Sequence, residues 1–182
     1  AEAAGKLILE KRTAALANVT EKSDNQGPVT EADLAADALI SEGLAKAFPN
    51  DVLITEETWA ADDDLPQAER VWCVDPLDGT RNYASGIPFY STVIGLALHG
   101  EVLIGVNYDP VRQEMFYAEK GKGAFLNGEP LKVSGRSCLD DSIIGTDLSY
   151  NDKGAANSLE ALHKIWPDMQ TARIMGSAAL GI

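Results

Sequence analysis

Two aspartates after an apolar run are the residues of this sequence best suited to chemistry. The run 71–74 is followed by Asp75 and Asp78, which are three residues apart. Carboxylates are hard oxygen ligands of the kind that Mg²⁺ prefers, and the backbone carbonyl of Leu77 between them would be another. Asp, Pro and Gly are also the usual turn residues, so a capped turn is the alternative interpretation of this stretch.

The next two residues add groups that could hold phosphate. Gly79 lets the backbone approach a ligand closely. A helix that begins at Thr80 would point its free N–H groups at an anion. The Thr80 hydroxyl could also hold a water or a phosphate oxygen. Together with the aspartates, these groups predict a metal site that handles phosphate.

A second acidic pair favours a metal site over a capped turn as the interpretation of residues 75–79. Glu56 and Glu57 follow the short strand predicted over 52–55. Strand ends of one sheet can converge in space although they are far apart in sequence. We therefore expect Glu56 to lie near Asp75 and Asp78.

The stretch 29–33, with the sequence VTEAD, carries a further carboxylate. Thr30 as N-cap and Asp33 at the third helical position predict a capping box, with Asp in place of the usual Glu or Gln. A carboxylate in the first turn of a helix can also accept a hydrogen bond from a hydroxyl. The structural role and the functional role can coexist.

The elements that must position these residues begin with two helices, over 3–17 and 31–48. We expect the second helix to bury one side, made of Leu34, Ala38, Ile40 and Leu44. Polar connectors are predicted at 21–27 and, with three consecutive aspartates, at 62–64. From residue 91 short connections predict an antiparallel meander with strands over 91–98, 101–108, 114–118, 124–126 and 130–134. The Asn127-Gly128 pair is a strong hairpin signal.

After Arg136 the pattern changes to alternating strand and helix. Strands are predicted over 142–146 and 170–174, with a helix over 155–165 between them and a turn at 176–178 that enters another helix. We therefore expect an α+β subdomain over 1–135, which carries the metal site, and the start of an α/β subdomain over 136–182.

Composition and charge exclude several classes of partner. The net charge is −13 over 182 residues, whereas a nucleic-acid-binding protein needs a basic face. No apolar run approaches the roughly 20 residues that span a bilayer, so no membrane partner is expected. Cys73 and Cys138 have no C-x-x-C spacing, which favours reduced thiols in a cytoplasmic protein. His99 and His163 are isolated, so any metal must be one that takes oxygen ligands.

Taken together, these motifs resemble those of the inositol monophosphatase family of magnesium-dependent, lithium-sensitive phosphatases. The resemblance covers nearly the whole chain and depends on five stretches in order. They are VTEAD at 29–33, EE at 56–57, WCVDPLDGTRNY at 72–83, GKGAFLNG at 121–128 and RIMGSAAL at 173–180. The resemblance implies a layered α-β-α-β-α sandwich of two subdomains and a homodimer.

The resemblance also implies a ligand set for two or three Mg²⁺ ions. Glu56, Asp75 and the Leu77 carbonyl are similar to ligands of the first ion, and Asp75 and Asp78 to ligands of the second. Glu56 would also help to hold a third, weaker ion near the attacking water.

The remaining site residues follow from the same resemblance. Thr80, hydrogen-bonded to Asp33, would orient and activate the attacking water together with Glu56. The backbone N–H groups of Gly79 and Thr80 would bind the phosphate.

The substrate side of the site is implied in the same way. Asp78 and the turn formed by Gly176, Ser177 and Ala178 would contact the sugar-like part of the substrate. In the family a further metal-binding Asp and a substrate-binding Glu lie beyond this turn, and we expect them beyond Ile182 in a longer protein; the alternative is that the second ion binds weakly.

The resulting functional hypothesis is an enzyme that hydrolyses a small sugar or polyol phosphate, with inositol monophosphate as the first candidate. Relatives also act on fructose 1,6-bisphosphate, histidinol phosphate or 3′-phosphoadenosine 5′-phosphate; Arg81-Asn82 after DGT argues mildly against the last of these. Two other classes stay open. A haloacid-dehalogenase-like phosphatase would form a phospho-aspartate at Asp75, although its motif places the carboxylates two residues apart rather than three. A relative without turnover would only bind phosphate esters or cations.

Overall fold

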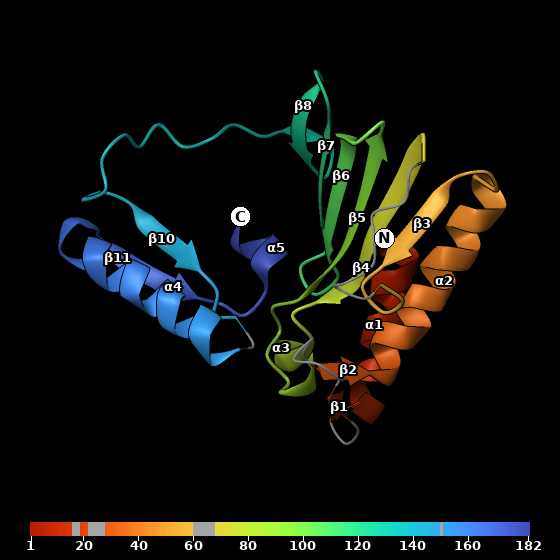
Figure 1. Ribbon diagram of the computed structural model, residues 1–182, viewed down its shortest axis with the longest axis horizontal. Helices are drawn as coiled ribbons and strands as arrows, with labels where there is room; N and C mark the ends of the chain where they lie inside the picture. The colour runs from red at the N-terminus through yellow and green to blue at the C-terminus, as the bar shows by residue number, and fades with distance from the viewer. Residues whose placement is uncertain (16–18, 22–27, 60–67, 150) are drawn as a thin grey trace.

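The computed structural model describes residues 1–15, 19–21, 28–59, 68–149 and 151–182. Two helices, α1 (Glu2–Ala15) and α2 (Glu31–Ala47), pack against each other and against one face of a seven-stranded sheet (Figure 1). A small antiparallel pair, β1 (Val19–Glu21) and β2 (Pro28–Thr30), precedes α2. The predicted connectors at 21–27 and 62–64 fall largely outside the described residues.

The large sheet has the strand order β3-β4-β5-β6-β7-β8-β9. Its first pair is parallel and every later pair is antiparallel, as the predicted meander requires. The strands are β3 (Val52–Thr55), β4 (Arg70–Asp78), β5 (Ser91–Leu98), β6 (Glu101–Asp109), β7 (Glu114–Glu119), β8 (Gly123–Leu126) and β9 (Glu129–Pro130). A short helix, α3 (Thr80–Ala84), follows β4 directly.

The chain after the meander forms a separate β-α-β unit. Strand β10 (Ile143–Thr146) pairs in parallel with β11 (Thr171–Ile174), and α4 (Asp152–Ile165) connects them, followed by a short 3₁₀ turn at Trp166–Asp168. A last helix, α5 (Ala178–Gly181), contacts β10 on one side and β5 and β6 on the other. In Figure 1 α5 lies between the large sheet and this unit, which gives the expected layered arrangement. The division of the chain near residue 135 stays a prediction.

The core lies between the helices and the sheet, around the strand that carries the aspartates. Tyr83 of α3 is fully buried and donates a hydrogen bond to the Ile8 carbonyl of α1 at 2.9 Å, while its ring meets Tyr90 edge to face. The buried apolar residues that form this cluster are Ala4, Ile8, Ala32, Ala36, Ile40, Val74, Leu77, Tyr83 and Tyr90. Burial of this cluster holds α1, α2, β4 and α3 together.

Three sequence-based expectations about the elements are wrong in detail: the buried side of α2, the extent of the strand over 130–134 and the length of the strand over 71–74. Leu34 is 54% exposed and Ala38 is exposed too, because the first turn of α2 directs Ala32 and Asp33 inward instead. The other two positions agree with expectation: Ile40 is buried and Leu44 packs against the core. Of the predicted strand over 130–134, only Pro130 lies in a strand, β9 (Glu129–Pro130), although Leu131 N still donates to the Ala124 carbonyl of β8 at 2.8 Å.

The strand predicted over 71–74 is longer, extending from Arg70 to Asp78. Its neighbour β5 offers pairing partners along this whole length, with Asp75 opposite Val93 and Asp78 opposite Ser91. The register shifts between the two aspartates, where Pro76, which has no N–H to donate, is tolerated. The two aspartates therefore lie within the final, irregular part of a strand and not in a loop beyond it.

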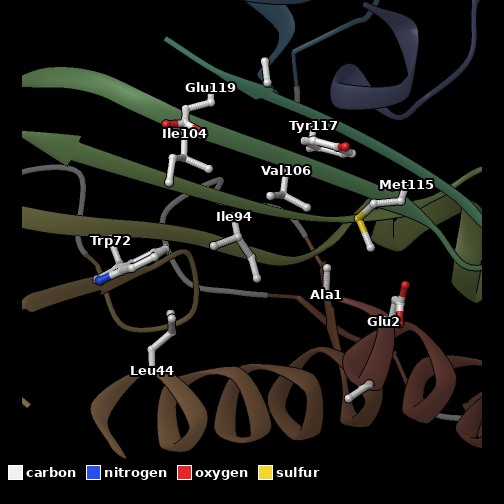
Figure 2. Close-up of a pocket in the computed structure, with 12 residues that line it drawn as sticks. Ala1, Glu2, Leu44, Trp72, Ile94, Ile104, Val106, Met115, Tyr117 and Glu119 are labelled. Carbon is white, nitrogen blue, oxygen red and sulfur yellow. The ribbon is translucent and has the colours of Figure 1, made fainter. Parts of the chain in front are cut away.

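An apolar groove of about 630 Å³ lies on the helix-covered face of the sheet, next to the start of α1 (Figure 2). Side chains of several strands face it, among them Trp72, Ile94, Ile104 and Val106. None of the acidic residues singled out from the sequence lines it. The groove is therefore not where the chemistry-bearing residues meet. None of the helices described is long and apolar enough to cross a membrane.

A half-buried ion pair ties the connection between α2 and β3 to β4 and gives a test of the fold. The Asp51 carboxylate, 4% exposed, accepts hydrogen bonds from Arg70 Nε at 2.8 Å and from Trp72 Nε1 at 2.9 Å. Asp51→Ala should lower the free energy of unfolding by about 2 kcal/mol, because both donors lose their acceptor. Urea titration measures this change. Glu101→Ala, which removes an exposed pair with Lys120, is the control and should have no measurable effect.

Candidate active site

The parallel pairing of β3 with β4 brings the first two acidic residues together. Thr55 is the register partner of Val74, so the next residues along the two strands, Glu56 and Asp75, lie side by side. The backbone continues the ladder, with Glu56 N donating to the Val74 carbonyl at 2.9 Å. The expectation that Glu56 and Asp75 converge is therefore confirmed by the register.

A negative charge on the Asp75 carboxyl is unfavourable. Burial, the neighbouring Glu56 and the nearby Asp78 together raise the pKa of Asp75 to about 8, and Glu56 also shares a hydrogen bond with it. One contact opposes this rise, a hydrogen bond that Leu77 N donates to Asp75 Oδ1 at 3.1 Å. A group in this position calls for a proton or a cation.

The donor atoms at this edge fit an oxygen-preferring divalent cation. Glu56 and Asp75 offer carboxylate oxygens, and the fully buried Leu77 adds its carbonyl nearby. Carboxylates plus a carbonyl are the ligands that Mg²⁺ accepts. Within the described part of the chain, however, no group of three or more His, Cys, Asp or Glu side chains is arranged around one metal position. Asp78, expected as a further ligand, has its oxygens engaged in hydrogen bonds with the start of α5.

Asp78 holds the turn that begins α5. Its carboxylate accepts hydrogen bonds from Ser177 Oγ, from Ala178 N at 3.2 Å and from Ala179 N at 3.0 Å. Burial raises the pKa of Asp78, and these hydrogen bonds partly oppose the rise. Asp78 and the turn Gly176–Ser177–Ala178, which were expected at the same place, are thus in direct contact.

Thr80 and Asp33 form the second half of the site. Thr80 Oγ1 donates to Asp33 Oδ1 at 2.8 Å and also lies 3.0 Å from the Leu77 carbonyl. The hydroxyl and the carboxylate come from the first turns of α3 and α2 and are both buried. The hydrogen bond implied by the resemblance is therefore present.

The predicted capping box orients Asp33. Its Oδ2 accepts from the Thr30 backbone N at 2.9 Å and from the Thr30 hydroxyl, while Thr30 Oγ1 accepts from the N–H groups of Ala32 and Asp33. Burial raises the pKa of Asp33, and the hydrogen bonds from Thr30 and Thr80 oppose the rise. One carboxylate thus caps a helix and accepts a hydrogen bond from a hydroxyl, the two contacts expected of VTEAD.

Gly79 is required at its position. It begins α3 with a φ of 90°, a left-handed conformation that suits glycine. A Cβ there would lie 3.1 Å from the Phe89 carbonyl and 3.2 Å from the Gly176 carbonyl. The turn that carries Gly79 therefore packs directly against the turn that carries Gly176.

Asp147 was not foreseen from the sequence. It follows β10, and its Oδ1 accepts a hydrogen bond from Gly176 N at 2.7 Å. It lies close enough to Asp78 to help raise the pKa of that residue. The signal was available: Asp147 comes directly after an apolar strand, as Glu56 does. A hollow of about 240 Å³ beside it is bordered by Met175 and Ala178 as well.

Comparison with known proteins places these features in context. The model of the "Inositol monophosphatase family" matches residues 1–182. Inositol monophosphatase 3 of Solanum lycopersicum is 40% identical over 163 residues, which cover 85% of this chain and 59% of that protein. Histidinol-phosphatase of Chlorobaculum parvum is 42% identical over 135 residues, covering 74% of this chain and 50% of that protein.

A solved structure agrees with the fold. The crystal structure of extragenic suppressor protein suhB from Bartonella henselae has a TM-score of 0.87 and 30% sequence identity, covering 100% of this chain and 69% of that chain. This similarity confirms the predicted fold class. The chain spans about three fifths of the length of the first curated relatives it matches.

Two aspartates one turn apart on α2 provide a test of the Asp33 network. Asp33→Ala should lower the free energy of unfolding by about 2 kcal/mol, because Thr30 N and the Thr80 hydroxyl lose a buried acceptor. Asp37→Ala is the matched control: Asp37 Oδ1 is buried without a hydrogen-bond partner among the described residues, so its removal should not destabilise the protein. Equal losses in urea titrations of both variants would contradict the assignment.

Proposed function

Because the chain belongs to the inositol monophosphatase family, we propose that the protein is a Mg²⁺-dependent phosphomonoesterase. The family resemblance drawn from the sequence is confirmed by the match over residues 1–182. We propose a small sugar or polyol phosphate as the substrate, with inositol monophosphate as the first candidate. The observation that carries the proposal is the Thr80–Asp33 hydrogen bond beside the Glu56–Asp75 pair.

Glu56, Asp75, the Leu77 carbonyl and Asp78 are the residues that would hold two or three Mg²⁺ ions. Bound Mg²⁺ polarises the phosphoryl oxygens and lowers the pKa of a bound water. The raised pKa of Asp75 supports this assignment, since a cation would offset the charge that burial and Glu56 make unfavourable. Asp78 would have to loosen its contacts with α5 or offer an oxygen that they leave free.

The chain's own residues would handle the water and the phosphate. Thr80 donates its hydroxyl hydrogen bond to Asp33. The lone pairs of the Thr80 oxygen can therefore accept a hydrogen bond from a water and orient it. Glu56 would take a proton from that water. At the same time the oxygen of the water would bond to phosphorus and the ester P–O bond would break. The N–H groups of Gly79 and Thr80 would hold the phosphate. Inorganic phosphate and the free alcohol are the products.

The alcohol part of the substrate would lie toward Asp78 and the turn at 176–178. Support comes from the hollow of about 240 Å³ that borders Ala178. Fructose 1,6-bisphosphate, histidinol phosphate and 3′-phosphoadenosine 5′-phosphate are the alternative substrates within the same family. The proposal also includes lithium sensitivity and a cytoplasmic homodimer, both supported by family membership alone.

Phosphate release by the intact protein tests the function. The panel consists of inositol 1-phosphate and the three alternative esters, each with Mg²⁺, with EDTA, and with Mg²⁺ plus Li⁺. We expect release that requires Mg²⁺, falls with Li⁺ and disappears in Asp75→Asn, with Asp152→Asn in the exposed first turn of α4 as the control. Release in EDTA, or a phosphoryl adduct on Asp75 found by mass spectrometry, would overturn the mechanism. No release on any ester would favour a relative that only binds.

Thr80→Ala tests the role of the hydroxyl. Loss of the group that orients the water should lower kcat by about 100-fold and change KM little. Thr80→Ser restores a hydroxyl and should recover most of the rate. Steady-state kinetics on the best substrate of the panel measures both variants. A change in KM alone would assign Thr80 to binding instead.

A further inference from the structure

We propose that Asn82 is a positioning residue that sets the placement of the substrate turn, Gly176–Ala178, against the phosphate turn, Gly79–Thr80. The inference rests on the phosphatase function proposed above and adds to it a residue with no role in metal, water or phosphate binding. Asn82 lies in α3, two residues after Thr80, and is 8% exposed.

The amide of Asn82 uses its donors on two separate segments. Its Nδ2 donates to the Met175 carbonyl at 2.7 Å and to the Phe89 carbonyl at 2.8 Å. Met175 is 93 residues away in sequence and immediately precedes the substrate turn. An amide nitrogen has two N–H groups, so these two bonds satisfy it. One side chain thus joins α3, the segment before β5 and the end of β11.

The substrate turn is shaped to receive this side chain. Gly176 has a φ of 73°, and a Cβ on it would lie 2.9 Å from Asn82 Oδ1 and 3.1 Å from Asn82 Nδ2. The backbone of the turn therefore packs directly on the amide plane. On the other side, the Gly176 carbonyl faces Gly79 at a distance that leaves no room for a side chain. A shift of Asn82 would therefore move one turn relative to the other.

Asp78 also contacts the substrate turn, but it cannot be the residue that fixes its place during the reaction. Its oxygens accept from Ser177, Ala178 and Ala179, and the same oxygens are proposed to serve metal and substrate. The bonds of Asn82 go to backbone carbonyls and compete with neither. Asp147, which accepts a hydrogen bond from Gly176 N at 2.7 Å, ties the turn to β10. Asn82 is the contact that ties it to α3 when Asp78 is engaged by a ligand.

Kinetics on two esters test the proposal in the intact protein. The first ester is the best substrate of the panel. The second is p-nitrophenyl phosphate, whose nitrophenyl group has no hydroxyl besides the esterified one for the substrate turn to recognise. Asn82→Ala should lower kcat/KM for the first by about 100-fold, since small misplacements of a positioning contact cost that much. The loss on p-nitrophenyl phosphate should be much smaller. Equal losses on both esters, or no loss, would overturn the proposal.

Asn151→Ala is the matched control. Asn151 Oδ1 caps α4 by accepting from Gly154 N at 2.7 Å and is exposed, so its loss weakens the C-terminal unit away from the site. This variant should lose stability without changing the ratio of the two kcat/KM values. A similar change of that ratio in Asn151→Ala would reduce Asn82 to a general structural role and overturn the proposal. Asn82→Asp keeps the side-chain size but not the donors, and it should reproduce the selective loss if Asn82→Ala does not fold.

Hydrogen exchange separates this inference from the proposed function. In Asn82→Ala, amide exchange over 176–181 should be faster than in the wild type, while exchange over 152–165 should not change. This readout does not depend on turnover. If the wild type releases no phosphate from any ester, the proposed function fails, and faster exchange over 176–181 would still support the tie between the turns. Unchanged exchange there would overturn the tie itself.

Discussion

The parallel pairing of β3 with β4 is the constraint on which the site depends. Because Thr55 is opposite Val74, the two strands deliver Glu56 and Asp75 to the same edge of the sheet. The irregular end of β4 then passes through Pro76 and Leu77 into α3 and so positions Asp78, Gly79 and Thr80. Thr80 meets Asp33 only because this path ends against the first turn of α2.

Three carboxyl groups are largely buried in a small region, and the chain stabilises each in a different way. Asp33 is surrounded by hydroxyl and backbone donors, and Asp78 by the amides at the start of α5. Asp75 has one backbone donor and two acidic neighbours. A negative charge is therefore least favourable at Asp75, and a strongly raised carboxyl pKa is a frequent property of functional sites.

Much of this arrangement follows from local patterns in the sequence. The bounds of β5, the Asn127-Gly128 hairpin turn and the capping box at Thr30 are local features, and each is present as predicted. The length of β4 could not be predicted, because it is decided by the partner strand β5 and not by its own residues. The buried face of α2 was misjudged at Leu34 for a similar reason: the polar Asp33 is buried there in place of an apolar residue.

The contacts of the turn at 176–178 were the hardest to foresee. Asp147 and Asn82 act on backbone groups of residues 175 and 176, and no spacing in the sequence indicates a hydrogen bond between a side chain and a distant carbonyl. The hydrogen bond from Thr80 to Asp33 was implied by family resemblance and not by pattern. Tertiary packing selects such partners, whereas local propensity does not.

The sequence separation within the site has a consequence for how the protein folds. The hydrogen bonds of Asp78 connect residues 99 to 101 positions apart, whereas the β10-α4-β11 unit forms from contacts within 32 residues. Closing long loops is entropically costly and slow, so local units form first. We therefore expect the acidic edge of β3 and β4 to exist before the turn at 176–178 docks on it. During synthesis, the turn at 79–80 would emerge and fold well ahead of the turn at 176–178.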